Sequence, residues 1–131
     1  MTRLTAPPAR LRSAPERLTA PERASGGERY GWRWDLAAKA YRRANPLCLG
    51  CAAVGDTRAT QVADHIVPFK GDERLKWDPA NRQPACDWHH SVVKQRLEAR
   101  FERGEIGAED LRLDSAAAVA LTLELGRAPR Q

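Results

Sequence analysis

Two pairs of residues in the chain have the spacing of metal ligands. Two residues lie between Cys48 and Cys51 in CLGC, and two lie between Cys86 and His89 in CDWH. Zn²⁺ prefers four sulfur or nitrogen ligands in a tetrahedron, and a two-residue gap lets one tight turn present two of them. The sequence therefore predicts a structural zinc site formed by these four residues. The alternative is a thiol redox pair at Cys48 and Cys51 with an unrelated third cysteine.

The two pairs are separated by residues 52–85, a span of 34 residues. A plain zinc ribbon has about 15–20 residues at this point. The longer span has room for a complete β-hairpin between a knuckle that carries the first pair and a helix whose opening turn carries the second. Because the domain is small, we expect metal binding to supply much of its folding energy.

A second group of polar residues lies in the same region and consists of Asp64, His65, Asn81 and His90. All the cysteines and histidines of the chain fall between positions 48 and 90. A chance distribution of surface residues does not readily explain this grouping. Adjacent residues on a helix point about 100° apart, so His89 and His90 are expected to serve different sites. Asp64 and His65 are neighbours on an expected strand and point to opposite faces, so they too can have separate roles.

The patterns around these residues predict a small α+β fold. The first helix is expected over residues 30–46 and ends at Asn45–Pro46. The remaining elements are a strand within 61–69, a loop over 70–81, a returning segment at 82–86, a helix over 86–104 closed by Gly104, and an Ala/Leu-rich helix from near Glu109.

Charge is distributed unevenly along the chain. The whole sequence has a formal net charge of +5, but residues 1–43 alone carry +6 and the rest carries −1. A basic segment favours a polyanionic partner, nucleic acid first, although a solvated arm without a partner explains the charge equally well. We divide the chain into a flexible basic arm at 1–29, a main domain at 30–104, and a C-terminal helix and tail at 105–131.

The sequence contains no signal-peptide segment and no apolar run of membrane-spanning length, so we expect an intracellular protein that does not associate with membranes. The odd number of cysteines, three, argues against a disulfide framework.

The segments NPLCLGC, DHIVP, DPANRQPAC and HHSVVK resemble the HNH endonucleases, whose ββα-metal core is treble-clef-like and held by a zinc knuckle. The resemblance covers residues 45–94, and the preceding helix is similar to that of small phage and prophage members. The chain departs from the pattern at His89, because the zinc-bearing members usually have cysteine there. Histidine is a competent zinc ligand.

The resemblance implies a role for each residue of the second group. His65 is the first histidine of the motif and the candidate general base, since an unperturbed imidazole titrates near pH 6.5, at about the working pH. Asp64 and His90 would hold one divalent cation, Mg²⁺ or a transition metal such as Mn²⁺ or Ni²⁺. Asn81 would pin the hairpin loop and so orient His65.

Contacts with the DNA backbone are predicted for several basic residues. Lys94 follows His90 by four residues and is expected on the same helical face, where it could contact phosphate. Weaker candidates are Lys70, Arg82, Arg42 and Arg43. The sequence contains no pattern for reading bases, so a weak sequence preference is expected.

The resemblance to phage proteins implies action with terminase subunits during DNA packaging in the cytoplasm of a bacterial host. Homing, restriction and defence enzymes use the same motif, so these roles stay open. Two other classes are also considered. One is a zinc-stapled nucleic-acid-binding or adaptor module without catalysis, and the other is a thiol oxidoreductase, which would leave Cys86 and the histidines without a role.

Overall fold

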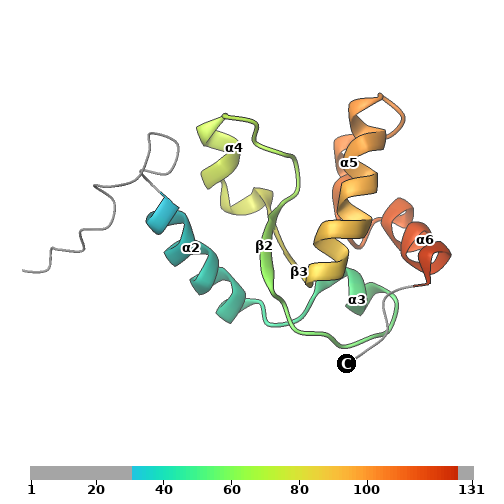
Figure 1. Ribbon diagram of the computed structural model, residues 1–131, viewed down its shortest axis with the longest axis horizontal. Helices are drawn as coiled ribbons and strands as arrows, with labels where there is room; N and C mark the ends of the chain where they lie inside the picture. The colour runs from blue at the N-terminus through green and yellow to red at the C-terminus, as the bar shows by residue number, and fades with distance from the viewer. Residues whose placement is uncertain (1–30, 127–131) are drawn as a thin grey trace, which may run out of the picture. The chain divides into compact units, whose positions relative to one another are not determined.

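The computed structural model describes residues 31–126, and the sheet in this part of the chain is one antiparallel pair of strands (Figure 1). β2 (Val62–His65) pairs with β3 (Arg82–Ala85), and the register places Asp64 opposite Gln83. The described residues thus have the small α+β architecture expected from the sequence, with the Asp64–His65 pair on the first strand.

The helices follow the predicted order. The longer ones are α2 (Gly31–Ala44), α5 (Lys94–Glu102) and α6 (Ala116–Leu125), and the short ones are α3 (Leu49–Ala53) and α4 (Glu73–Trp77). Single turns of 3₁₀-helix lie at Pro79–Asn81 and Ala108–Leu111, and a π-helical turn lies at His89–Val93, directly before α5. Gly104 follows α5 with φ of 77°, a left-handed conformation that ends the helix as predicted.

The chain divides into two units, Met1–Ala37 and Ala38–Gln131, and the boundary falls within α2. Both strands and all the cysteines and histidines lie in the second unit. The predicted basic arm at 1–29 lies outside the described residues, as does the end of the predicted tail. No helix among residues 31–126 is both long and apolar enough to cross a membrane.

Two elements differ from their sequence predictions. The loop at 70–81 contains α4, which begins at Glu73. Asp72 caps this helix, because its carboxylate accepts hydrogen bonds from the backbone N–H groups of Arg74 and Leu75. The C-terminal helix begins at Ala116 and not near Glu109, because Ser115 caps it by accepting a hydrogen bond from the Ala118 N–H at 3.0 Å.

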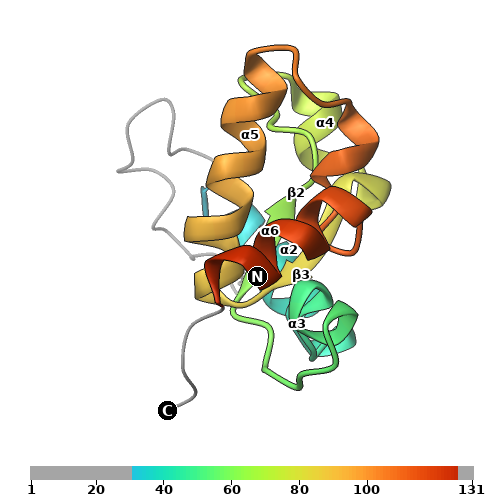
Figure 2. The ribbon, with the colours of Figure 1, turned by 90° about the vertical axis from the view of Figure 1, so that its right-hand side faces the viewer.

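The apolar core lies between β3, α5 and α6. Figure 2 shows α6 beside the start of α5 and near α3, so the C-terminal helix packs against both cysteine-bearing segments. The buried core residues are Ile66, Ala85, Val93, Leu97, Leu111, Leu113, Ala118 and Leu121.

The first cysteine pair is held in a closed loop over residues 46–60. Leu47 and Ala59 form an isolated antiparallel bridge, and the Cys48 N–H donates to the Arg58 carbonyl at 2.8 Å. α3 starts immediately after Cys48, and Gly55 turns the chain back with φ of 82°. This loop is the knuckle that the sequence predicted.

Candidate metal centre and adjacent polar pocket

Cys48, Cys51, Cys86 and His89 form a buried cluster. The Nδ1 atom of His89 lies 3.6 Å, 3.5 Å and 3.6 Å from the sulfur atoms of Cys48, Cys51 and Cys86, in that order. The sulfurs of Cys51 and Cys86 are 3.8 Å apart, and all four candidate ligand atoms lie within 4.8 Å of one another. Each residue is at most 3% exposed. The four residues are therefore positioned to bind one metal ion.

The three sulfur–nitrogen distances and the distance between the sulfurs of Cys51 and Cys86 are consistent with a tetrahedral zinc ion. Zn–S bonds of about 2.3 Å and Zn–N bonds of about 2.0–2.1 Å, at tetrahedral angles, place two sulfurs about 3.8 Å apart and a sulfur and nitrogen about 3.5 Å apart. The third cysteine belongs to the same cluster. The alternative of a thiol redox pair at Cys48 and Cys51 leaves Cys86 outside the site. The arrangement does not favour that alternative, because Cys86 lies in the same cluster.

The two halves of the cluster are built in the same way. Cys48 lies just before α3 and its sulfur accepts a hydrogen bond from the Cys51 N–H at 3.4 Å. Cys86 lies just before the helical segment that continues into α5, and its sulfur accepts from the His89 N–H at 3.5 Å. Each two-residue gap is therefore one turn that directs two ligands to the same side and stabilises negative charge on the first sulfur.

The thiols influence each other's protonation. The side-chain hydrogen bond between Cys48 and Cys86 lowers the pKa of Cys86 and raises the pKa of Cys48, because one thiolate is shared between the two sulfurs. A metal ion binds all three residues as thiolates, so its binding releases protons and is favoured at higher pH.

Thr122 of α6 fixes the orientation of the His89 ring. The Nε2–H of His89 donates to the Thr122 hydroxyl oxygen at 3.1 Å, and that hydroxyl donates to the Ala118 carbonyl at 2.8 Å. This direction requires the proton on Nε2, so the lone pair of Nδ1 faces the three sulfurs. Thr122 was not predicted from the sequence, although a threonine in an Ala/Leu-rich helix is a weak signal of a polar partner.

Gly50 is required by the close approach of the His89 ring. A Cβ atom at position 50 would lie 2.3 Å from Cδ2 and 2.4 Å from Nε2 of that ring. No side chain fits at those distances, so the glycine in CLGC permits the fourth ligand to reach the cluster.

Asp64 and His90 form a second polar pair close to the cluster. The Nδ1 atom of His90 is 3.1 Å from Oδ1 of Asp64, and Gln83 Nε2 donates to Oδ2 of Asp64 at 2.9 Å. Burial tends to raise the pKa of Asp64, but the hydrogen bond with His90 and the charge of Lys94 outweigh it and the pKa is lowered. The same hydrogen bond raises the pKa of His90.

Gln83 connects this pair to the C-terminal segment. It is fully buried, donates to the Leu111 carbonyl at 3.1 Å, and accepts from the Leu113 N–H at 2.8 Å. Gln83 was not predicted as a site residue, because nothing in its local sequence distinguishes it from an ordinary strand residue.

His65 is half-buried and its ring is held by the backbone of α4. Its Nε2 atom lies 3.0 Å from the carbonyl of Lys76, which requires a proton on Nε2 and leaves the basic lone pair on Nδ1. The Phe69 ring packs edge-on at a centroid distance of 4.8 Å. Burial lowers the pKa of His65, so the imidazole is neutral at neutral pH.

Asn81 pins the loop between the strands. Its amide Nδ2 donates to the carbonyls of Val67 at 2.9 Å and Leu75 at 3.1 Å, while Oδ1 accepts from the Val67 N–H at 2.9 Å. These bonds tie the start of the loop to α4, whose Lys76 carbonyl contacts the His65 ring. The hydrogen bonds of Asn81 are thus those that a loop-pinning role requires.

Asp64, His65 and His90 line one pocket of about 230 Å³, together with Phe69, Lys70 and Glu98. The residues that line the pocket come from β2, from the loop that follows it, from the π-helical turn at His89–Val93 and from α5. It has room for several water molecules or for a phosphate group beside the polar pair.

Lys94 differs from its sequence prediction as an exposed phosphate contact. Its side chain is fully buried, and its ammonium group forms ion pairs with Asp64 at 3.0 Å and Glu98 at 2.7 Å. Lys94 and His90 both contact Asp64, but the Lys94 side chain is turned into the protein, whereas the His90 side chain is 40% exposed.

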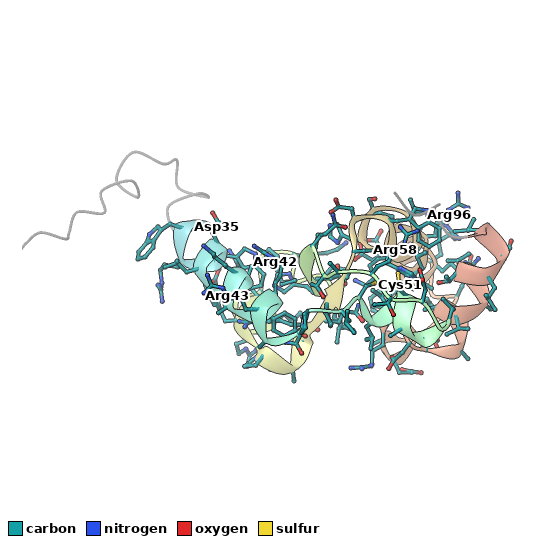
Figure 3. The ribbon with its side chains drawn as sticks, turned by 90° about the horizontal axis from the view of Figure 1, so that it is seen from below. Asp35, Arg42, Arg43, Cys51, Arg58 and Arg96 are labelled. Atoms are coloured by element: carbon teal, nitrogen blue, oxygen red, sulfur yellow. The ribbon has the colours of Figure 1, made fainter. Side chains whose placement is uncertain are left out.

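The other predicted phosphate contacts remain predictions. Lys70 is exposed and forms an ion pair with Glu102, and Arg82 donates to the Trp77 carbonyl at 3.3 Å. Arg42 and Arg43 extend from α2 (Figure 3).

No known family model matches the chain, and no curated protein or solved structure is significantly similar to it.

Replacing Cys86 by serine is expected to remove bound zinc and most of the thermal stability, because three buried ligands would lose their common ion. Elemental analysis and thermal unfolding measure both effects. Asp87→Asn, at the exposed neighbouring position, is the control and should retain both. An unchanged melting temperature in Cys86→Ser, with no zinc in the wild type, would disprove the zinc site.

Replacing Thr122 by valine should weaken zinc binding roughly 10–100-fold, because the His89 ring loses its orienting acceptor. Competition with a chromophoric chelator gives the affinity. Thr122→Ser keeps the hydroxyl and should bind zinc nearly as well as the wild type. Equal affinity in the valine variant would show that α6 does not orient the ligand.

Proposed function

We propose that the chain is a metal-dependent HNH endonuclease that hydrolyses phosphodiester bonds of DNA. The observation that carries this proposal is the meeting of Asp64, His65 and His90 in one pocket, beside a loop pinned by Asn81. The order of hairpin, Asn-pinned loop and helix supports a ββα-metal, treble-clef-like core. The match between the motif residues and these separate contacts is more specific than the fold class alone.

Zinc is the metal we assign to the Cys48, Cys51, Cys86 and His89 cluster. Three sulfurs and one nitrogen are a donor set that zinc prefers, and four protein ligands close the coordination sphere. A closed site is structural, so the zinc would hold the fold and take no part in hydrolysis.

Asp64 and His90 are the proposed ligands of the catalytic ion. In an octahedral site with bonds of about 2.1 Å, neighbouring ligands are about 3.0 Å apart, close to the observed separation. Asp64 Oδ1 and His90 Nδ1 are 3.1 Å apart, so one oxygen and one nitrogen donor fit a shared Mg²⁺, Mn²⁺ or Ni²⁺ ion. Such a cation supplies Lewis-acid stabilisation of the charge that develops on the phosphate and the leaving oxygen.

His65 is the proposed general base. Its Nδ1 would accept the proton of a water molecule that attacks the phosphorus. The Lys76 carbonyl holds the opposite nitrogen, so the ring cannot rotate and the positive charge formed on proton transfer is stabilised. Because burial lowers the pKa of His65, the ring is in its basic form at neutral pH.

DNA is the proposed substrate because the sequence combines these residues with an excess of basic side chains in its first 43 residues. Arg42, Arg43, Lys70 and Arg82 would contact phosphates and give a salt-dependent affinity with weak sequence preference. A phage or prophage enzyme that acts with terminase is the role we propose, and the family resemblance alone supports it.

The zinc-loaded protein is expected to nick or linearise plasmid DNA when Mg²⁺, Mn²⁺ or Ni²⁺ is added, and to be inactive without a further divalent ion. His65→Ala should lower the rate at least about 100-fold, because the base is lost. DNA binding, measured by fluorescence anisotropy, should remain nearly unchanged.

Gln95→Ala is the matched control, since Gln95 lines the same pocket but has no proposed role, and it should cut like the wild type. A His65→Ala variant that cuts as fast as the wild type contradicts the mechanism. Wild-type protein that binds DNA but cuts with none of the three ions would favour the non-catalytic binding module.

A further inference from the structure

Lys94 is buried at a position where a lysine is costly to place. Its side chain is 0% exposed, and moving an ammonium group out of water is unfavourable unless its N–H donors are paired. The pairing is complete. Nζ lies 2.7 Å from the His65 carbonyl oxygen, 2.7 Å from Glu98 Oε2 and 3.0 Å from Asp64 Oδ2.

The three acceptors form an oxygen cage around one positive charge. Two are carboxylates, from β2 and α5, and the third is a backbone carbonyl of β2. Carboxylate and carbonyl oxygens are also the ligands that hard metal cations prefer. The oxygen atoms that surround the ammonium group are therefore of the kinds that could bind a metal cation at the same position.

These contacts also determine which Asp64 oxygen faces His90. Lys94 and Gln83 both bind Oδ2, so Oδ1 is left toward the imidazole. Lys94 in addition holds the backbone carbonyl of His65, the proposed base. One buried charge thus fixes both neighbouring residues of β2.

We propose that Lys94 is the internal counter-cation of this centre, which positions Asp64 and His65 and fills a place that a second metal ion would otherwise take. The centre then accepts one exchangeable divalent ion, between Asp64 and His90. The inference rests on the proposed function for its catalytic part, but the number of ions bound can be measured without DNA.

Lys94→Met is the main test variant. Methionine reaches as far as the lysine ε carbon and leaves the position of Nζ open. The side chains of Asp64, Glu98 and Lys94 together carry −1, the single variant leaves −2, and K94M/E98Q returns to −1. The double variant therefore separates charge balance from positioning. Lys39→Met, at an exposed site on α2, is the matched control.

The first measurement is Mn²⁺ binding to zinc-loaded protein in the absence of DNA, by calorimetry or electron paramagnetic resonance. We expect one Mn²⁺ ion in the wild type and in Lys39→Met, and two in Lys94→Met. Zinc content and cooperative melting establish that each variant is folded, and K94M/E98Q should recover most of any loss in melting temperature. A single Mn²⁺ ion in folded Lys94→Met would overturn the counter-cation role.

The second measurement is plasmid cleavage at saturating Mn²⁺. We expect K94M/E98Q to cut about 100-fold more slowly than the wild type, because displacement of reacting groups by about 1 Å has an effect of that size. Glu98→Gln alone should cut much faster than the double variant. If K94M/E98Q cuts plasmid DNA as fast as the wild type, Lys94 serves only to balance charge, and the positioning role is wrong.

The two measurements can fail separately. If no protein cuts DNA but Lys94→Met binds the second Mn²⁺ ion, the proposed function is wrong and the counter-cation role stands. If the wild type cuts DNA but folded Lys94→Met binds one ion, the function stands and the inference about Lys94 is wrong.

Discussion

The convergence of three sulfurs and one imidazole nitrogen is the constraint on which the other features depend. It joins the 46–60 loop to the start of the helical segment that continues into α5, and through Thr122 it also contacts α6. The ligands are buried, and the small β-hairpin could not hold these segments together alone. A shared metal ion would hold the four groups together, because thiols without an ion form only weak hydrogen bonds.

This cluster positions the residues of the pocket because His90 directly follows His89, one of the four members of the cluster. His89 faces the cluster and His90 faces Asp64, as expected from their angular separation on a helix. The segment from His89 to Val93 is a π-helical turn, in which the Lys94 N–H bonds to the His89 carbonyl. Such turns frequently occur at functional sites. Here the wider turn contains both histidines, and Lys94, which follows it, has a buried side chain.

The sequence predicted the features that depend on local spacing. The Cys-x-x-Cys and Cys-x-x-His pairs did meet. The loop-pinning role of Asn81 was implied by the family resemblance and not by local spacing, and the structure shows hydrogen bonds of Asn81 to Val67 and Leu75. The residues it missed depend on partners far along the chain. Thr122 acts on His89, and Gln83 bonds to Asp64 and to the backbone at 111–113. Lys94 could not be distinguished from a surface lysine, because one of its carboxylate partners lies 30 residues earlier, at Asp64.

The helix boundaries show the same limit. Acidic residues at 109 and 110 are typical of a first helical turn, but Asp110 instead bonds to the Gly107 N–H and closes a short 3₁₀ turn. Ser115 then caps α6, which brings Thr122 to the level of His89. Local propensity allowed both starting points, and packing against the cluster and the core selected the later one.

We propose above all that His89 and His90, which are adjacent at the start of one helical segment, bind two different metal ions. Anomalous diffraction from crystals grown with Zn²⁺ and Mn²⁺, recorded at the absorption edge of each metal, tests it most directly. We expect a zinc peak among Cys48, Cys51, Cys86 and His89, and a separate manganese peak between Asp64 and His90. A single metal peak that both histidines share, or no peak beside Asp64 and His90, would contradict the account.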